Sequence, residues 1–577
     1  MWKLLRFLKK YAAQSVCAPI FKGLEVAFEL IVPIVIAAVI DKGIVLADKP
    51  YIFKMCGVLV LLAVVGLSCT LLAQYFAAKA SVSFCSDIRS ALFKHISKLS
   101  FSQIDGIGTP TLITRLTGDL NQVQTGVNLT LRLLIRSPFV VFGAVIMAFT
   151  VDSRAATVFA VTVPILAVII FAVMLITIPL YKHTQQLLDK LLSKISESLL
   201  GVRVIRAFCK EREEYSEFEA ANSKLCATQL RVGRISALLN PLTVVIVNLS
   251  IALLIYRGAL QVDSGYLSKG QVVALYNYMT QILIELIKLA NLIINIAKSI
   301  ACGNRIQAVF DTQPDIVSGD TTVATPAEYA IEFDNVTFAY AKGAEPAIKN
   351  INLKIKPHET VGIIGATGSG KSTLINLIPH FYTPDSGTVS VFGKNVNSFS
   401  LDFLRGKIGL VPQNAVLFKG TVRENMRMSN PNATDEEIFA ALKTAQAEDF
   451  ILKKNGVLDF VVEQNGKNLS GGQRQRLNIA RALVRKPEIL ILDDSSSALD
   501  YATDAALRTA IKNLDFPCTV IIVSQRASSL RHADKIVVLE KGSIVDVGTD
   551  NELKERCGIY REIRRTQFEE AGGESDE

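Results

Sequence analysis

Six long apolar segments constrain the fold of this sequence more than any other feature. A helix needs about 20 mostly apolar residues to cross a bilayer. Segments of that length lie at roughly 17–40, 53–80, 129–151, 155–180, 236–257 and 271–298. Of the 577 residues, 50% are hydrophobic and only 20% are charged, which is too apolar for a soluble enzyme. We therefore expect an all-α six-helix transmembrane domain over residues 17–310.

The connections between these segments are asymmetric. Those after the second and fourth segments are long and rich in Lys and Arg, and the other connections are short. Because positive charge concentrates in cytoplasmic segments, we expect the long connections and the N-terminus in the cytoplasm. Patterns such as LLDKLLSKISESLL predict cytosolic helical extensions of the spans. Residues 1–16 alternate basic and apolar side chains, which is typical of an interfacial elbow helix or of a plain basic N-terminus.

The net charge of +9 does not by itself indicate nucleic-acid binding. No basic and aromatic recognition element accompanies it, and a lipid bilayer is the expected partner. The nine cysteines lack C-x-x-C pairs and clustered histidines, so the sequence predicts free thiols and no cysteine-based metal site.

The composition changes after residue 310. Residues 311–330 are rich in Pro, Ser, Thr and Asp, as is typical of a linker. Over 331–565, short strands such as TVGIIG, PEILIL and CTVIIVS alternate with helical stretches, which predicts an α/β domain with a mainly parallel sheet. The acidic tail at 566–577 is expected to be disordered.

A phosphate-binding motif begins the α/β domain. GATGSGKS at 365–372 fits G-x-x-x-x-G-K-[ST], between the strand TVGIIG and the helical STLINLI. Backbone N–H groups of such a turn bind phosphate, the lysine reaches the terminal phosphates, and the serine offers its hydroxyl to Mg²⁺. The motif therefore predicts a site for nucleotide phosphates and Mg²⁺, and ATP is the nucleotide that the family resemblance described below implies. The expected nucleotide-binding residues are Gly365, Thr367, Gly368, Ser369, Gly370, Lys371, Ser372 and Thr373.

Three further motifs accompany the phosphate loop. LSGGQ at 469–473 precedes the helical QRLNIARAL, so its glycines and serine form a second anion-binding surface. ILILD ends in Asp493, whose carboxylate is placed to hold magnesium through water. Between them lies VPQ with Gln413, and we assign the metal ion to Ser372, Gln413 and Asp493.

This combination resembles the ATP-binding cassette (ABC) family over essentially the whole chain. Six spans followed by an α/β P-loop ATP-binding cassette domain resemble one half of an ABC exporter. The resemblance implies that Tyr340 stacks on adenine, that Gln413 links magnesium to the membrane part, and that Asp500 of SALD touches the opposite site of a dimer. Each ATP in the family lies between the phosphate loop of one cassette and the LSGGQ of the other. The residues offered to a partner's site would be Ser470, Gly471, Gly472 and Gln473.

Two segments of the long connections resemble the coupling segments of this family. They are FSQIDGIGTPTLITRL (101–116) and GVRVIRAF (201–208). The first departs from the family pattern, because Gln103 and Ile104 replace the usual aromatic pair before the aspartate. An ordinary cytosolic helix is the alternative for both segments.

Two residues of the nucleotide site depart from the family pattern. Asp494 stands where the family usually has a glutamate base, and Gln525 stands where it usually has a histidine at the γ-phosphate. A base must lie within about 2.6–3.2 Å of the attacking water, and misplacement by an ångström can cost roughly 10²-fold. Glutamine has no titratable charge. VVEQNG (461–466) is a weaker departure. A tolerated conservative change is the alternative for Asp494 alone, but both changes together predict an impaired site.

An intact LSGGQ beside an impaired base predicts a heterodimer, because a homodimer would repeat the defect in both sites. A second, different half-transporter would supply the glutamate and the histidine. The pattern resembles the degenerate-site subunit of bacterial multidrug exporters, which implies export of hydrophobic or amphipathic compounds across a bacterial plasma membrane. A lipid or peptide exporter half and a non-pumping ATP sensor are the alternatives.

The last apolar segment has one polar side, as a period of 100° per residue shows. Ionisable residues within a span usually face a cavity or one another. Glu25 and Glu29 in the first span also share a face and would suit cationic amphipathic substrates. The predicted translocation cavity comprises Glu25, Glu29, Gln281, Glu285, Lys288, Asn291 and Asn295.

Two alternatives apply to this cavity. Glu285 and Lys288 at i and i+3 can form a neutralised pair. The acidic residues of the first span, which also carries Lys22, can be hydrated or paired with another helix. Asp41 ends the first span and is predicted to help close an external gate.

Overall fold

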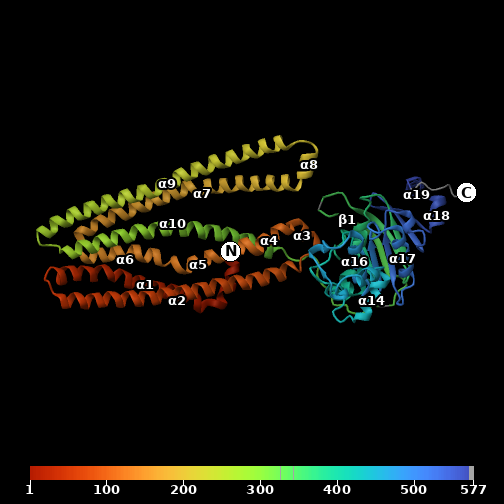
Figure 1. Ribbon diagram of the computed structural model, residues 1–577, viewed down its shortest axis with the longest axis horizontal. Coiled ribbons are helices and arrows are strands. Elements are labelled where there is room, and N and C mark those ends of the chain that lie inside the picture. The colour runs from red at the N-terminus through yellow and green to blue at the C-terminus, as the bar shows by residue number, and fades with distance from the viewer. Residues whose placement is uncertain (325, 342, 571–577) are drawn as a thin grey trace. The chain divides into compact units, whose positions relative to one another are not determined.

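The computed structural model describes residues 1–324, 326–341 and 343–570 (Figure 1). The chain divides into two compact units. One comprises Met1–Ser97 and Gly108–Gln313, and the other comprises Lys98–Ile107 and Pro314–Glu577. The short segment Lys98–Ile107 thus belongs with the C-terminal part, although the first unit surrounds it in sequence.

The first unit is helical. Among the described residues, six helical stretches are long and apolar enough to cross a membrane, and each predicted apolar segment lies inside one of them. The elements are η1 Trp2–Tyr11, α1 Ala12–Ala38, the π-helical η2 Val39–Ile44, α2 Lys49–Ile96, α4 Thr109–Thr114, the π-helical η3 Arg115–Asp119, α5 Leu120–Leu133, α6 Arg136–Val151, α7 Ser153–Leu200, α8 Val202–Ala207, α9 Glu211–Asp263 and α10 Lys269–Asp311.

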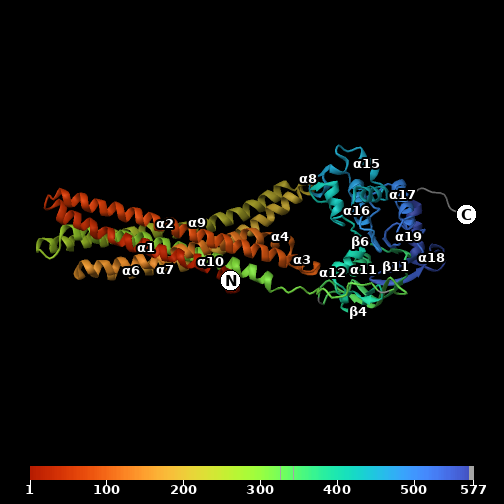
Figure 2. The ribbon, with the colours of Figure 1, turned by 90° about the horizontal axis from the view of Figure 1, so that it is seen from below.

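The long helices extend well beyond the thickness of a bilayer. Helix α7 has 48 residues and α9 has 53, and at 1.5 Å per residue they are about 70–80 Å long, against a hydrocarbon core of about 30 Å. These two helices run side by side in both views (Figures 1 and 2). Helix α1 packs against α2, and α10 packs against α5 and α6. The apolar core joins α1, α6, α7, α9 and α10 through buried residues such as Val26, Val140 and Phe159.

The second unit contains three sheets. The largest has the order β12-β11-β3-β10-β9-β6, in which all neighbours are parallel except β12. An antiparallel sheet has the order β2-β1-β4-β5, and β7 pairs with β8. The strands are β1 Ile331–Phe338, β2 Ile348–Ile355, β3 Thr360–Ile364, β4 Ser386–Val391, β5 Lys394–Asn395, β6 Ile408–Val411, β7 Gly420–Thr421, β8 Val461–Val462, β9 Ile489–Asp493, β10 Thr519–Val523, β11 Lys535–Glu540 and β12 Ser543–Gly548.

Strands β3, β9 and β11 are almost wholly buried, as expected for a sheet covered on both faces. The second unit also contains the following helices, one of which comes from the segment 98–107. They are α3 Phe101–Ile107, α11 Lys371–Leu377, η4 Val396–Ser398, α12 Leu401–Lys407, α13 Val422–Arg427, α14 Asp435–Thr444, α15 Glu448–Leu452, η5 Val457–Asp459, η6 Gln464–Gly466, α16 Gly471–Leu483, α17 Tyr501–Lys512, η7 Ala527–Ser529, α18 Asp550–Arg556 and α19 Gly558–Glu570.

The two ends of this unit differ in how they match the sequence. The predicted linker at 311–330 lies between α10 and β1, and Thr321 forms an isolated bridge with Phe399 there. The expected disorder of 566–577 is wrong for its first part, because α19 continues to Glu570. Residues 571–577 lie outside the described part of the chain.

Candidate functional site

The candidate nucleotide site lies where neighbouring parallel strands end. The phosphate loop follows β3, Gln525 follows β10, Asp493 ends β9, and Gln413 follows β6. Ligands of open parallel sheets bind at this carboxyl edge. A cavity of about 300 Å³ is present here, and its lining contains most of the predicted nucleotide and metal residues. The lining residues are Tyr340, Ala347, Thr367, Gly368, Ser369, Gly370, Lys371, Ser372, Thr373, Gln413, Asp493, Asp494, Val523 and Gln525.

The phosphate loop is packed tightly behind the cavity. A Cβ at Gly365 would lie 2.2 Å from the Leu539 carbonyl oxygen, so only glycine fits there. The Ser369 hydroxyl is buried without a hydrogen-bond partner in the described part of the chain. A buried polar group without a partner is costly, and a bound phosphate oxygen would satisfy it.

Lys371 is buried and points into its own loop. Its Nζ donates to the carbonyl oxygens of Gly365 and Ala366 at 2.8 Å each. Burial lowers the pKa of Lys371, and the carboxylates of Asp494 and Asp493 oppose that effect. A terminal phosphate beside this ammonium group would oppose the effect of burial, because its negative charge favours the protonated form of Lys371.

The metal assignment rests on oxygen atoms that meet in the cavity. The Ser372 hydroxyl donates to Asp493 Oδ1 at 3.2 Å. Burial raises the pKa of Asp493, which the hydrogen bond from Ser372 partly opposes. Hydroxyl and carboxylate oxygens are the ligands that Mg²⁺ accepts alongside substrate phosphates. Ser372 and Asp493 therefore fit a Mg²⁺ ion that accompanies ATP, and Gln413 also lines this cavity.

Tyr340 borders the cavity and is held by its hydroxyl. That hydroxyl lies 2.9 Å from Thr373 Oγ1. Its ring packs edge-on against Phe338 and Tyr382, with centroids 5.1 and 5.3 Å away. The side chain is half exposed, so an aromatic surface remains for a nucleobase. Stacking on adenine stays a prediction.

The two departures from the family pattern lie together in this cavity. Gln525 Nε2 donates to Asp494 Oδ2 at 3.5 Å, and the Asp494 N–H donates to the Val523 carbonyl oxygen at 3.0 Å. Asp494 has a φ of 44°, a left-handed conformation that aspartate tolerates better than most residues. Burial raises its pKa, and the charges of Lys371 and Arg526 oppose this.

The signature residues lie outside this cavity. Ser470 caps the start of α16, accepting from the Gln473 N–H at 3.3 Å, and the Gln473 side chain accepts from the Ser470 N–H at 3.0 Å. A Cβ at Gly472 would lie 3.0 Å from the Ala498 carbonyl oxygen, so the signature and the SALD segment pack closely. Asp500 caps α17 by accepting from the Thr503 N–H at 3.1 Å, which lowers the Asp500 pKa.

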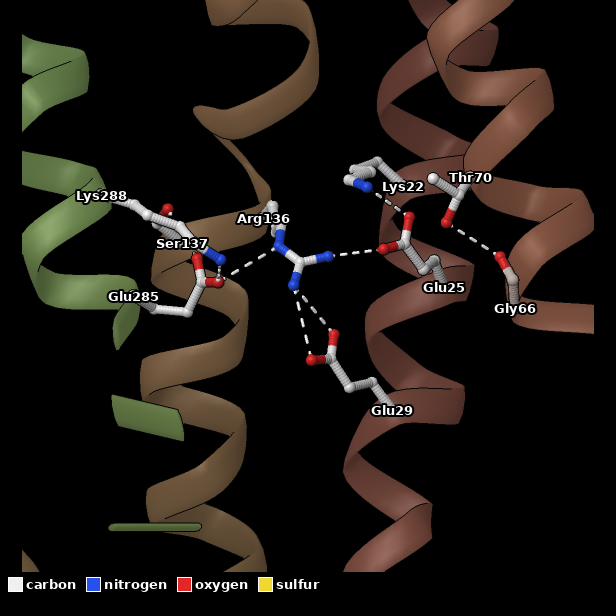
Figure 3. A network of polar contacts seen from close by, with 9 residues as sticks. All are labelled: Lys22, Glu25, Glu29, Gly66, Thr70, Arg136, Ser137, Glu285 and Lys288. Atoms are coloured by element: carbon white, nitrogen blue, oxygen red, sulfur yellow. Dashed lines mark hydrogen bonds and ion pairs between the residues drawn. The ribbon is translucent and has the colours of Figure 1, made fainter. Parts of the chain in front are cut away.

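In the helical unit, several residues of the predicted cavity form an ion-pair network (Figure 3). Arg136 on α6 is its centre. Its guanidinium lies 2.5 Å from Glu25 and 3.0 Å from Glu29, both on α1, and 3.3 Å from Glu285 on α10. Lys22 pairs with Glu25 at 2.5 Å. Glu285 also accepts from Lys288 at 2.8 Å and from the Ser137 hydroxyl at 3.0 Å.

The acidic residues of this network are all paired with cations. Three glutamates face three cations, so the cluster is balanced. The Glu285 side chain is only 3% exposed, and its part in a translocation cavity stays a prediction. The alternatives of a neutralised Glu285–Lys288 pair, and of pairing between the first span and another helix, match these contacts.

The remaining cavity candidates on α10 divide between interior and surface. The Oε1 of Gln281 is buried and has no partner among the described residues. Asn291 is exposed, and its carbonyl oxygen accepts from Asn295 Nδ2 at 2.9 Å. Their part in translocation stays a prediction.

Arg136 was missed by sequence reasoning, which followed periodicity within single helices. A signal was present, because Arg136 is the only ionisable residue between 133 and 151, at the edge of an apolar segment. A lone arginine in a span usually has a partner. That partner lay on other helices, where periodicity gives no information.

Asp41 joins the end of the first long helix to the start of the last. Its carboxylate accepts from the Gly270 N–H at 2.8 Å and from the Ser268 hydroxyl. Ser268 caps α10, so Asp41 reinforces that cap. A role in an external gate stays a prediction.

The predicted coupling segments are short helices. Residues 101–116 contain α3 and α4, and 201–208 contain α8. In the second unit, Phe101 on α3 packs edge-on against Phe381 with centroids 4.8 Å apart. Gln103, one of the departures from the family pattern, caps α3 by accepting from the Ser100 N–H at 3.2 Å. The coupling role of both segments stays a prediction.

The fold and the site together define a membrane protein with a P-loop nucleotide-binding domain. The model of the ABC transporter transmembrane region matches residues 16–286, and the ABC transporter model matches 348–497. The chain is 37% identical over 575 residues to the uncharacterized ABC transporter ATP-binding protein YfiB of Bacillus subtilis, covering 100% of both chains. The chain belongs to the ABC transporter family.

Two further comparisons agree with this assignment. The chain is 34% identical over 494 residues to an ATP-dependent lipid A-core flippase of Syntrophus aciditrophicus, covering 84% of this chain and 80% of the relative. A solved structure of a bacterial Atm1-family ABC exporter with ATP bound has a TM-score of 0.81 at 22% identity, over 99% of both chains. That likeness shows the exporter fold. The chain is therefore a multi-pass membrane protein whose ATP-binding domain implies ATP-driven transport.

Proposed function

We propose that the chain is one subunit of a heterodimeric ATP-driven exporter of hydrophobic or amphipathic compounds. One observation carries the proposal. Asp494 and Gln525, the two departures from the family pattern, lie together in the nucleotide cavity, whereas the intact signature Ser470–Gln473 lies outside it.

The cavity supports binding without efficient hydrolysis. The phosphate loop, Lys371, Ser372 and Asp493 provide the contacts that ATP and Mg²⁺ need. The base position is weak, because the carboxylate of Asp494 is one methylene shorter than a glutamate and Gln525 cannot exchange a proton as histidine does. This chain's own site then holds ATP and turns it over slowly.

The partner supplies what this chain lacks. A second, different half-transporter contributes the glutamate and histidine, and this chain contributes Ser470–Gln473 to that site. Asp500, exposed at the start of α17 beside the signature, would contact the partner. The N-terminus and the nucleotide-binding domain lie in the cytoplasm of a bacterial cell, and the spans lie in its plasma membrane.

The balanced network around Arg136 supports an amphipathic substrate over a strongly cationic one, because the cluster has no excess of carboxylates. A lipid exporter half is the second candidate. The name of the lipid A-core flippase at 34% identity favours it.

The test is reconstitution of the chain in liposomes, alone and with each candidate half-transporter from the same genome. We expect ATP-dependent export of an amphipathic dye only from a mixed pair that copurifies. The matched variant is Asp494→Glu with Gln525→His, which should raise the ATPase activity of this chain alone at least about 10-fold. Brisk export by this chain alone, unaffected by a partner, would overturn the proposal. Movement of a labelled lipid instead of the dye selects the second candidate.

A further inference from the structure

The C-terminal helix is bonded directly to the backbone around Gln525. Gln567 on α19 donates from Nε2 to the Gln525 carbonyl oxygen at 2.6 Å. Its Oε1 accepts from the Ala527 N–H at 2.8 Å. One side chain therefore brackets Arg526 and holds the backbone that directly follows the Gln525 side chain, although the sequence predicted a disordered tail at Gln567.

The helix that carries Gln567 is itself anchored. The Tyr560 hydroxyl is buried and donates to Asp550 Oδ1 at 2.6 Å, and Arg564 lies 3.1 Å from the same carboxylate. Tyr560 belongs to a core cluster with Ala527 and Leu530. The position of Gln567 is thus set by packing and not by Gln567 alone.

The contacts continue from Gln567 to the nucleotide cavity. The backbone that Gln567 holds carries the Gln525 side chain, which donates to Asp494 at 3.5 Å. Both Gln525 and Asp494 line the cavity. If the backbone on either side of Arg526 rotated, the Gln525 amide would leave the position that would face a bound γ-phosphate.

We propose that Gln567 is a positioning residue for the nucleotide site, acting through the backbone of Gln525. The role at the γ-phosphate rests on the proposed function of this cavity, but the role of Gln567 does not require a heterodimer or hydrolysis. An analogue of ATP that cannot be hydrolysed therefore tests it without testing the rest.

Removal of Gln567 should leave the fold intact. Gln567 lines a second cavity of about 730 Å³, together with Arg508 and Arg531. Water in this cavity, which charged side chains help to line, can bond the two backbone groups that Gln567→Ala frees. The variant should therefore fold and differ in the freedom of the Gln525 peptide.

The experiment measures the affinity of the full chain in lipid nanodiscs for the non-hydrolysable ATP analogue and for ADP. Gln567→Ala should weaken binding of the analogue roughly five-fold, the effect of one net hydrogen bond, and leave ADP binding unchanged because ADP lacks the γ-phosphate. Gln567→Glu keeps the acceptor for the Ala527 N–H, so its affinity for the analogue should lie between those of the wild type and Gln567→Ala. Thr566→Ala is the matched control, because among the described residues the Thr566 hydroxyl donates only to carbonyl oxygens of its own helix.

A double variant separates positioning from general stability. In a Gln525→Ala background, Gln567→Ala should have no further effect on the analogue, since there is no amide left to position. Equal weakening of the analogue and of ADP would assign Gln567 a purely structural role. Additive effects of the two substitutions would overturn the proposal in the same way.

Discussion

Replacement of Arg136 by methionine should destabilise the helical unit by about 3 kcal/mol. The side chain balances a cluster in which three glutamates face three cations, so its loss leaves one negative charge without a partner. Loss of one partner of a buried ion pair costs about 3–5 kcal/mol. Glu25 and Glu285 keep Lys22 and Lys288 as partners, and Glu29, which loses its partner, is 36% exposed and can be hydrated. The lower end of the range is therefore expected.

The assay is thermal unfolding of the chain in lipid nanodiscs, followed by circular dichroism. Arg132→Met is the matched control, because it removes the same charge from the preceding helix α5, and the described residues include no ion partner for Arg132. A second variant, Arg136→Met with Glu29→Gln, removes the carboxylate that the loss of Arg136 leaves unpaired, and it should recover most of the lost stability. Equal melting of Arg136→Met and Arg132→Met, or a double variant less stable than the single one, would refute the electrostatic account of this cluster.

Two more predictions concern the second unit. Burial raises the pKa of Asp494 above its ordinary 3.8, so ionisation of this carboxylate costs stability as the pH rises through the folded pKa. Asp494→Asn should therefore raise the melting temperature of the nucleotide-free chain at pH 7, and the gain should vanish toward pH 4. No gain at pH 7 would contradict this. Phe101→Ala removes an edge-on contact with Phe381, worth about 0.5–1.5 kcal/mol, and transport should fall while ATPase activity persists. Phe93→Ala is the control, because Phe93 is exposed. Loss of transport and ATPase activity together would argue against a coupling role.

The nucleotide cavity could be predicted from sequence because its residues follow parallel strands. Gln413, Asp493 and Gln525 are far apart in the chain, yet each follows or ends a strand of one sheet. The carboxyl ends of parallel strands meet at one edge, so motif positions alone place these side chains together. The six apolar segments are predictable for a similar reason, since bilayer thickness sets a minimum length.

Contacts between separate elements could not be predicted, because the periodicity of one helix does not show which elements pack against it. The partners of Arg136 lie on α1 and α10, and nothing in the α6 sequence specifies which helix packs beside it. Gln567 lies close to an acidic, glycine-containing end, whose composition predicts disorder, whereas packing of Tyr560 extends the helix. In both cases tertiary packing, and not local composition, determines the observed structure.

The central claim is that this chain completes its partner's hydrolytic site and not its own. It is tested most directly by comparing Ser470→Arg with Asp494→Ala in the purified heterodimer, with ATPase activity as the readout. The signature serine at the start of α16 should be essential, so Ser470→Arg should abolish turnover, whereas Asp494→Ala should change it less than about two-fold. Loss of turnover in Asp494→Ala, with Ser470→Arg still active, would show that Asp494 is a working base and would contradict the account.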